Sequence, residues 1–183
     1  DLARAVPGTT LILDHFGTPL GVGRFEGKRD EIFKAWKDHM AELAECPNVM
    51  PKLGGMCMPD NGFGYMHRDL PPSSDEIVDM QGKWYAHMLE VFGPSRCMFE
   101  SNFPADRSRL SYGKMWNTMK WLTAGASADE KHDLFWRSAS RVYRLAEPVD
   151  GSDSQHELNG SAEQERALIN ISEPTRLLSN AYA

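Results

Sequence analysis

The side chains best suited to chemistry lie in residues 96–107. There an apolar stretch that reads as a strand leads into three polar residues, Glu100, Asn102 and Asp106. In α/β proteins, catalytic and binding groups gather at the C-terminal ends of parallel strands. Either carboxylate could act as a general base toward water, whereas the Asn102 amide can only orient a water or hold a carbonyl oxygen. Asn102 could also simply close a turn, and Asp106 could simply be solvated.

Two charged residues, Lys52 and Glu100, stand inside segments that otherwise read as buried strands. A lone buried charge is costly, so such groups are normally paired. We therefore predict that Lys52 and Glu100 meet at the floor of a pocket. There Lys52 could bind a carboxylate or carbonyl oxygen of a substrate, and Glu100 could accept a proton. A structural ion pair accounts for the same pattern equally well.

Further candidates follow the strands. His15 ends the first strand, before a glycine loop, where a neutral imidazole could ligate a metal or polarise a substrate, or could simply cap the loop. Basic residues on the loops could bind a carboxylate, since arginine forks suit that group, although most surface arginines are only solvated: Arg24, His67, Arg68, Arg107 and Arg109. The Met56–Met66 loop, with Phe63 and Tyr65, predicts either a lid over an apolar part of the substrate or a surface that packs against the missing half-barrel.

The elements that must position these residues alternate along the chain. Apolar and β-branched runs predict strands, and apolar residues at helical spacing predict helices. The strands are expected at 9–14, 49–53 and 96–101, and the helices at 29–45, 74–92, 111–123 and 128–145. Capping-box pairs begin two of the helices, Ser73 with Glu76 and Ser127 with Glu130. Pro51 weakens the second strand, because proline cannot donate to a central ladder.

This alternation predicts an α/β fold with a parallel sheet. Three parallel strands make a poor sheet by themselves, because both faces and both edges need cover. A complete (β/α)8 barrel needs about 250 residues, and the body of this chain is roughly half of that. We therefore expect a partial barrel domain over 1–146, either a small open domain or the C-terminal part of something larger, followed by an acidic, mobile tail over 147–183.

Composition narrows the class of protein. The net charge of −6 over 183 residues offers no broad basic footprint for nucleic acid, and no apolar run is long enough to span a membrane. The three cysteines, Cys46, Cys57 and Cys97, show no pairing pattern, which favours reduced thiols and a cytoplasmic setting. Cys57 and Cys97 read as buried inert thiols, and the five tryptophans read as sheet-facing core.

Four segments together resemble the amidohydrolase-related family of (β/α)8-barrel hydrolases, in the branch that includes sugar lactonases and dicarboxylate lactonases. They match in order and spacing over residues 1–146: Leu13–Gly17, Pro51–Gly55, Cys97–Pro104 and Ser140–Leu145. The resemblance implies the C-terminal half of a TIM barrel. It also implies hydrolysis of a C–O or C–N bond in a small-molecule substrate, most often a lactone, by an activated water.

The resemblance also implies a site, and this chain departs from it twice. The family has a His-x-His pair on its first strand, a further histidine on a later strand and an aspartate base on its last strand. His15 matches the later histidine, which implies a metal-ligating role, and a divalent metal such as zinc is expected in the complete barrel. Asn102 stands where the aspartate is expected, and no two histidines are spaced as His-x-His. By this resemblance the protein is a hydrolase, but we do not expect the fragment to be active by itself. The rival hypothesis is an incomplete, non-enzymatic interaction or oligomerisation module that pairs with itself or with a missing N-terminal half-barrel.

Overall fold

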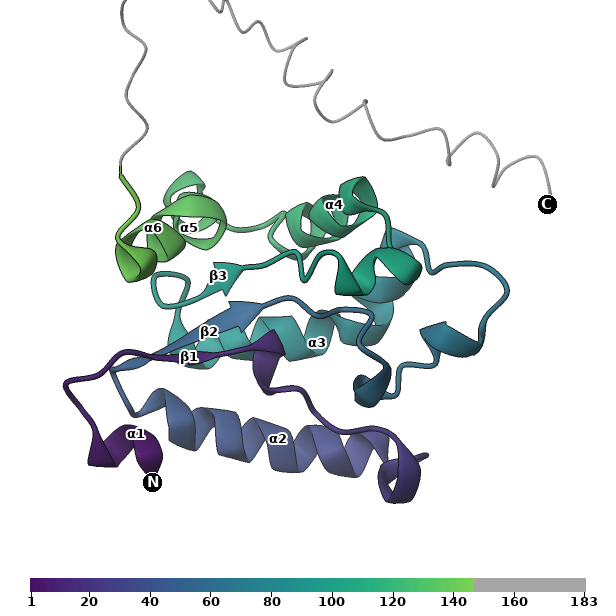
Figure 1. The fold of residues 1–183 in the computed structure, drawn as a ribbon, viewed down its shortest axis with the longest axis horizontal. Helices are drawn as coiled ribbons and strands as arrows, with labels where there is room; N and C mark the ends of the chain where they lie inside the picture. The colour runs from purple at the N-terminus through teal and green to yellow at the C-terminus, as the bar shows by residue number, and fades with distance from the viewer. Residues whose placement is uncertain (147–183) are drawn as a thin grey trace, which may run out of the picture. The chain divides into compact units, whose positions relative to one another are not determined.

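The computed structural model describes residues 1–146 (Figure 1), so the predicted tail over 147–183 lies outside the described residues. The strands are β1 (Leu11–Leu13), β2 (Val49–Leu53) and β3 (Met98–Phe99). The helices are α1 (Leu2–Ala5), α2 (Arg29–Ala44), α3 (Ser74–Phe92), α4 (Tyr112–Leu122), α5 (Ala128–His132) and α6 (Ser138–Tyr143), with a π-helical turn, Asp133–Arg137, between the last two. The predicted alternation of strands and helices is confirmed.

The three strands form a parallel sheet in the order β1-β2-β3. Pro51 therefore lies in the central strand, which corrects the expectation drawn from its missing N–H. Pro51 pairs with Leu13 of β1, but β3 joins the sheet only at the next residue, where Lys52 pairs with Met98. The proline thus lies outside the ladder between β2 and β3, and its missing N–H removes no bond there.

β1 and β3 are shorter than predicted because each runs into a tight turn. His15 and Phe16 have φ angles of 50° and 43°, and Asn102 has a φ of 50°. Residues in this left-handed region cannot continue a strand. The polar residues that follow the strands are therefore presented on turns at the C-terminal edge of the sheet.

The helices begin where the sequence predicts. Both capping boxes are present, Ser73 with Glu76 at α3 and Ser127 with Glu130 at α5. The single helix predicted over 128–145 is instead interrupted by the π-helical turn and ends at Tyr143, before Arg144, whose φ is 54°. Both predicted capping boxes are thus confirmed, and the π-helical turn that interrupts the last helix packs against β3.

The helices cover the sheet in sequence order. α2 packs against α3, and α3 packs against α4 and β2; α2 lies beside β1, and α5 and α6 lie beyond β3 (Figure 1). The aromatic centre of the core joins the turn after β1 to α2 and α3 through Phe16, Trp36, Trp84 and Tyr85. The prediction that all five tryptophans are core holds for Trp36 and Trp84, with Trp116 packed against the core; it is wrong for Trp121, which is 45% exposed, and Trp136 is only partly buried outside the core cluster.

Candidate active site

The C-terminal ends of the three strands bring three of the predicted residues together. His15 follows β1, Lys52 is the penultimate residue of β2, and Glu100 follows β3. The parallel register places these ends at one edge of the sheet, and the N–H of Glu100 continues the ladder by donating to the Leu53 carbonyl at 3.2 Å. We call His15, Lys52 and Glu100 the strand-end cluster.

Glu100 is the centre of the strand-end cluster. Its Oε1 accepts hydrogen bonds from the His15 backbone N–H at 3.2 Å and from His15 Nδ1 at 2.5 Å. Its Oε2 lies 2.7 Å from Lys52 Nζ, and the Glu100 side chain is only 12% exposed. The predicted meeting of Lys52 and Glu100 is therefore confirmed as a contact.

A second carboxylate, Asp14, also contacts Lys52 and was missed by sequence reasoning. Its Oδ1 lies 2.7 Å from Lys52 Nζ, so one ammonium is shared by two carboxylates. Burial lowers the pKa of Lys52, but the hydrogen bonds to Asp14 and Glu100 outweigh it, so the pKa lies above its ordinary value. Lys52 is thus held in its charged form. The position of Asp14, directly before His15 at the strand's end, was the signal available in the sequence.

The hydrogen bonds determine which nitrogen of His15 is available. With Glu100 ionised, Nδ1 carries the proton and donates it, so in the neutral ring Nε2 has a lone pair. Among the described residues, no hydrogen bond reaches Nε2. A carboxylate that orients an imidazole in this way is the arrangement found in catalytic triads. The cluster therefore presents a fixed imidazole with one free basic nitrogen.

Two glycines make room for the cluster. A Cβ on Gly54 would collide with the side chain and carbonyl of Glu100, and a Cβ on Gly55 would lie 2.9 Å from the His15 ring. Gly55 also has a φ of 65°, which disfavours any other residue. In the sequence these glycines mark only the end of a strand, because their neighbours come from β1 and β3.

Asn102 and Asp106 form a separate pair beside the cluster. Asp106 is 2% exposed; its Oδ1 accepts from Asn102 Nδ2 at 3.0 Å, and its Oδ2 accepts from the Cys57 N–H at 3.4 Å. Burial raises the pKa of Asp106, against the lowering effect of these two hydrogen bonds. Both carboxylate oxygens are thus used within the protein. This geometry suits a residue that holds the turn after β3 and the loop at Cys57 in place.

The basic loop residues do not join the cluster. Arg24, His67 and Arg107 are exposed, and within residues 1–146 none of them forms a hydrogen bond or an ion pair with the cluster. Arg68 pairs with Glu76 at 2.6 Å. Arg109 donates to the carbonyls of Met66 and Arg68 and so ties down the loop over 56–72. Their predicted substrate-binding roles stay predictions.

The loop over residues 56–72 packs mainly on the protein's own core. Met56, Phe63 and Tyr65 are buried, and Gln81 of α3 donates to both the Met56 carbonyl and the Tyr65 hydroxyl. The first part of this loop therefore packs on the chain's own core, while Leu70 is exposed, and both the lid and the packing against a missing half-barrel stay predictions.

The donor set of the described residues does not fit a metal ion. Within residues 1–146, no group of three or more His, Cys, Asp or Glu side chains is arranged to hold one. The two carboxylates nearest His15 already share the Lys52 ammonium, and a second cation beside it would be repelled. Metal ligation by His15 therefore stays a prediction, and no chemical step is drawn through a metal.

The cysteines are free and buried, as predicted for inert thiols. Burial raises the pKa of Cys57 and of Cys97 to about 12, so the reactive thiolate is disfavoured in both. The cytoplasmic setting stays a prediction. In the part of the chain that the structure describes, no helix has the length and apolar character needed to cross a membrane.

Several known proteins are similar to this chain in sequence. The curated relatives include the uncharacterised protein y4mH of Sinorhizobium fredii, 33% identical over 146 residues, and L-fucono-1,5-lactonase of Burkholderia multivorans, 32% identical over 142 residues. These alignments cover 79% and 76% of this chain but 42% and 45% of the relatives. The chain thus spans less than half the length of the curated relatives it matches.

Solved structures of amidohydrolases are also similar to this chain. Crystal structures of an amidohydrolase from Burkholderia multivorans, one with bound HEPES and one with bound zinc, superpose on this chain with TM-scores of 0.64 at 26% and 25% identity. Each superposition covers 79% of this chain and 47% of the crystallised chain. The family model described as Amidohydrolase matches residues 1–145, the same residues that carry the parallel sheet and the strand-end cluster. The chain therefore belongs to the amidohydrolase family.

Proposed function

We propose that residues 1–146 supply the C-terminal half of a (β/α)8-barrel hydrolase that opens a lactone by attack of water on its carbonyl carbon. Family membership supports hydrolysis, and a relative named L-fucono-1,5-lactonase supports a sugar 1,5-lactone as the substrate class. Alignment to just under half of the solved amidohydrolase chains supports a half-barrel. The observation that carries the proposal is the imidazole of His15, oriented by Glu100 at a strand end.

In the proposed mechanism, His15 Nε2 takes a proton from water as the water attacks the lactone carbonyl. Both oxygens of Glu100 already accept hydrogen bonds, so we assign the role of base to His15 instead of Glu100. Glu100 stabilises the imidazolium that forms. When the tetrahedral intermediate collapses, His15 returns the proton to the departing ring oxygen, which gives the hydroxy acid.

Lys52 also takes part in this mechanism. An ammonium has three donors, and two of them are directed to Asp14 and Glu100. We assign the third to the carbonyl oxygen of the lactone, where negative charge develops in the transition state. Because its pKa is raised, Lys52 keeps this charge at neutral pH.

Lactone hydrolysis by the full chain tests the proposal. Proton release from L-fucono-1,5-lactone and from δ-valerolactone is measured against the spontaneous rate. His15→Asn removes the base and keeps a residue that tolerates the left-handed backbone, while the exposed His39→Asn serves as the matched control. When each chain is assayed together with an N-terminal half-barrel that completes the site, we expect turnover in the wild type and in His39→Asn and none in His15→Asn. Equal turnover in all three proteins would refute the assignment of His15.

The non-enzymatic interaction module is the second candidate, and one observation favours it. β1 and β3 are the edge strands of a three-stranded parallel sheet within the described residues, and such edges favour pairing with another chain. A folded chain that shows no turnover of either lactone, and that associates with itself in sedimentation equilibrium, would favour this candidate over the hydrolase.

A further inference from the structure

A pocket of about 490 Å³ lies beside the turn that follows β3. It is formed by that turn, by the 3₁₀ turn Ala105–Ser108 and by the first turn of α4, and Pro71 of the loop before α3 also lines it. Small-molecule sites in proteins have volumes of about 300–1,000 Å³, so this pocket is large enough for a ligand. No residue of the strand-end cluster lines it, so the two sites are distinct.

Every charged residue that lines this pocket is basic. Arg107, Arg109 and Lys114 line it without any aspartate or glutamate, although the chain has 26 acidic and only 20 basic residues. Among the described residues, none of the three forms an ion pair, and both Nη atoms of Arg109 donate to the backbone carbonyls of Met66 and Arg68. A cleft lined by one sign of charge concentrates ions of the opposite sign. The pocket therefore favours an anion.

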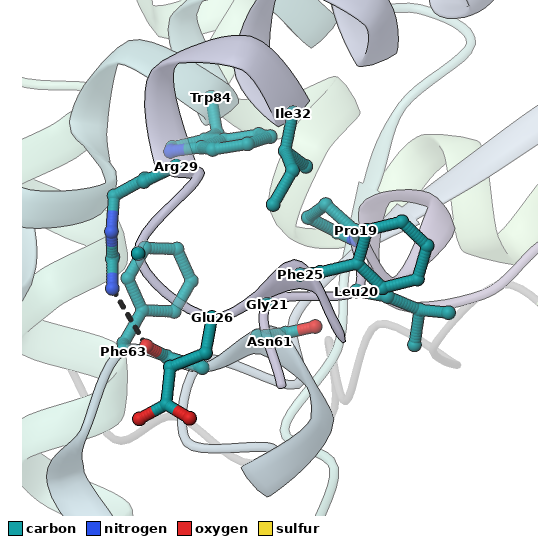
Figure 2. Close-up of a pocket in the computed structure, with 12 residues that line it drawn as sticks. Pro19, Leu20, Gly21, Phe25, Glu26, Arg29, Ile32, Asn61, Phe63 and Trp84 are labelled. Carbon is teal, nitrogen blue, oxygen red and sulfur yellow. Dashed lines mark hydrogen bonds between the residues drawn. The ribbon is translucent and has the colours of Figure 1, made fainter. Parts of the chain in front are cut away.

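A second pocket, of about 220 Å³, has charges of both signs. It lies between the loops after β1 and β2, beside Trp84 (Figure 2). Glu26 and Arg29 both line it, and Figure 2 shows the hydrogen bond that Arg29 Nη2 donates to the Gly62 carbonyl. Opposite charges on one wall partly cancel, so this pocket has little preference for an anion. The excess of positive charge is thus a property of the pocket beside α4 and not of both pockets.

Aromatic rings form the apolar part of the pocket beside α4. Phe103 and Tyr112 meet edge to face, with 5.2 Å between the ring centres and 87° between the ring planes. Phe103 packs against the core, whereas Tyr112 is 54% exposed. The buried partner holds the Tyr112 ring in place, and the exposed part of that ring can pack against a planar group of a ligand. Unpaired cations and an accessible aromatic ring therefore occur together in one pocket.

We propose that this pocket binds a small molecule that joins an aromatic ring to a phosphate monoester. Such a phosphate carries nearly two negative charges at pH 7 and accepts hydrogen bonds from the Arg107 guanidinium and the Lys114 ammonium. Arg109 contributes its charge alone, because its Nη atoms already donate to the loop carbonyls. The aromatic ring of the ligand packs on Tyr112. A carboxylate has one charge and gains less from the same cations. The site does not depend on the proposed lactone hydrolysis.

Titration of the full chain with phenyl phosphate tests the proposal. Isothermal titration calorimetry measures the affinity, and the ring resonances of Tyr112 in a ¹H–¹³C correlation spectrum, assigned through Tyr112→Phe, report where the ligand binds. We expect saturable binding that shifts the Tyr112 resonances. Methyl phosphate, which lacks the ring, and phenylacetate, which has a single negative charge, should each bind about tenfold more weakly.

Variants at positions that are exposed or partly exposed separate binding from folding. Arg107→Met and Lys114→Met should each weaken the binding of phenyl phosphate by about tenfold. Tyr112→Ser should remove the advantage of phenyl phosphate over methyl phosphate. Lys120→Met, an exposed cation farther along α4 that does not line the pocket, is the matched control and should bind as the wild type does.

Four results would each overturn the proposal. The first is that phenyl phosphate fails to saturate, and the second is that it saturates without shifting the Tyr112 resonances. The third is that phenylacetate binds as tightly as phenyl phosphate. The fourth is that Arg107→Met or Lys114→Met binds phenyl phosphate as tightly as the wild type does.

Discussion

A single carboxylate oxygen of Glu100 binds both the backbone N–H and the ring Nδ1 of His15, at 3.2 Å and 2.5 Å. The two residues follow β1 and β3, so this contact reaches across the end of the central strand. His15 has a φ of 50°, a conformation that costs free energy for a residue other than glycine. Glu100 therefore holds both the conformation of His15 and the orientation of its ring.

Glu100→Gln should lower kcat for lactone hydrolysis by about 10²–10⁴-fold with little change in KM, because the amide cannot stabilise the imidazolium as a carboxylate does. Circular dichroism checks that the variant is folded. Glu31→Gln, at an exposed position on α2, is the matched control and should retain wild-type turnover. Unchanged turnover in Glu100→Gln would remove Glu100 from the mechanism.

Lys52→Met should lower the free energy of unfolding by about 1.5–3 kcal/mol at pH 7, because Asp14 and Glu100 lose their shared cation. The pKa of Lys52 is raised above its ordinary value of 10.5 in the folded state. Its stabilising contribution is therefore complete below pH 10.5 and is lost as the pH rises through the raised value. Urea unfolding at pH 7, 9 and 11.5 should show the gap between wild type and variant narrowing only at the highest pH. Lys34→Met, on the exposed face of α2, should have the same free energy of unfolding as the wild type at every pH. If the difference between wild type and Lys52→Met were equal at all three pH values, the raised pKa would be contradicted.

Gly54→Ala should reduce the free energy of unfolding by about 1–3 kcal/mol, because the added methyl group meets the side chain and carbonyl of Glu100. Lactone turnover should fall with it, since Glu100 must move. Gly125→Ala is the matched substitution, because nothing lies within 4 Å of the added Cβ. Thermal and urea unfolding measure the stabilities of the two variants relative to the wild type. If Gly54→Ala were as stable as Gly125→Ala, the close approach of β2 to Glu100 would be absent in solution.

Asp106→Asn should change the pH dependence of stability. Burial raises the pKa of Asp106 above its ordinary value of 3.8, so the folded state binds this proton more tightly than the unfolded state does. Stability from this group is therefore greatest at low pH and decreases as the pH rises through the raised value, by about 1.4 kcal/mol for each unit of the shift. The free energy of unfolding of the wild type, relative to Asp106→Asn, should increase as the pH falls from 7 to 4. Asp60→Asn, on an exposed side chain, controls for the loss of one charge. A relative stability that is flat with pH, or that falls toward pH 4, would contradict the raised pKa.

Local features of the fold could be predicted from the sequence. The bounds of helix α3 and the residues of both capping boxes match the predicted ones, because a cap is made by side chains three residues apart on the same segment. The contact between Lys52 and Glu100 was also predictable, since a lone charge in an apolar strand requires a partner. Neither inference needed knowledge of how distant segments pack.

Other features depend on contacts between segments. Pro51 is tolerated in the central strand because β3 joins only at Lys52, and that register cannot be read from either segment separately. Asp106 looks like a solvated loop acid in the sequence, yet it is buried because the turn after β3 folds onto Cys57. The pocket at Arg29 and Trp84 is formed by the loops after β1 and β2 together with residues of α2 and α3, which are far apart in the chain.

The sequence by itself therefore determined the parallel α/β order, the helix caps, the family and the charged pair at the strand ends. The strand and helix order, the caps and the charged pair rest on short-range periodicity, local hydrogen bonding or the cost of an unpaired charge, whereas the family rests on the resemblance of four segments. Only the tertiary structure decided that Glu100 holds His15 by its Nδ1, that Asp14 shares Lys52, and that Asp106 is buried. The physical reason is that these relationships depend on strand register and loop packing, which bring together atoms that lie tens of residues apart in the chain.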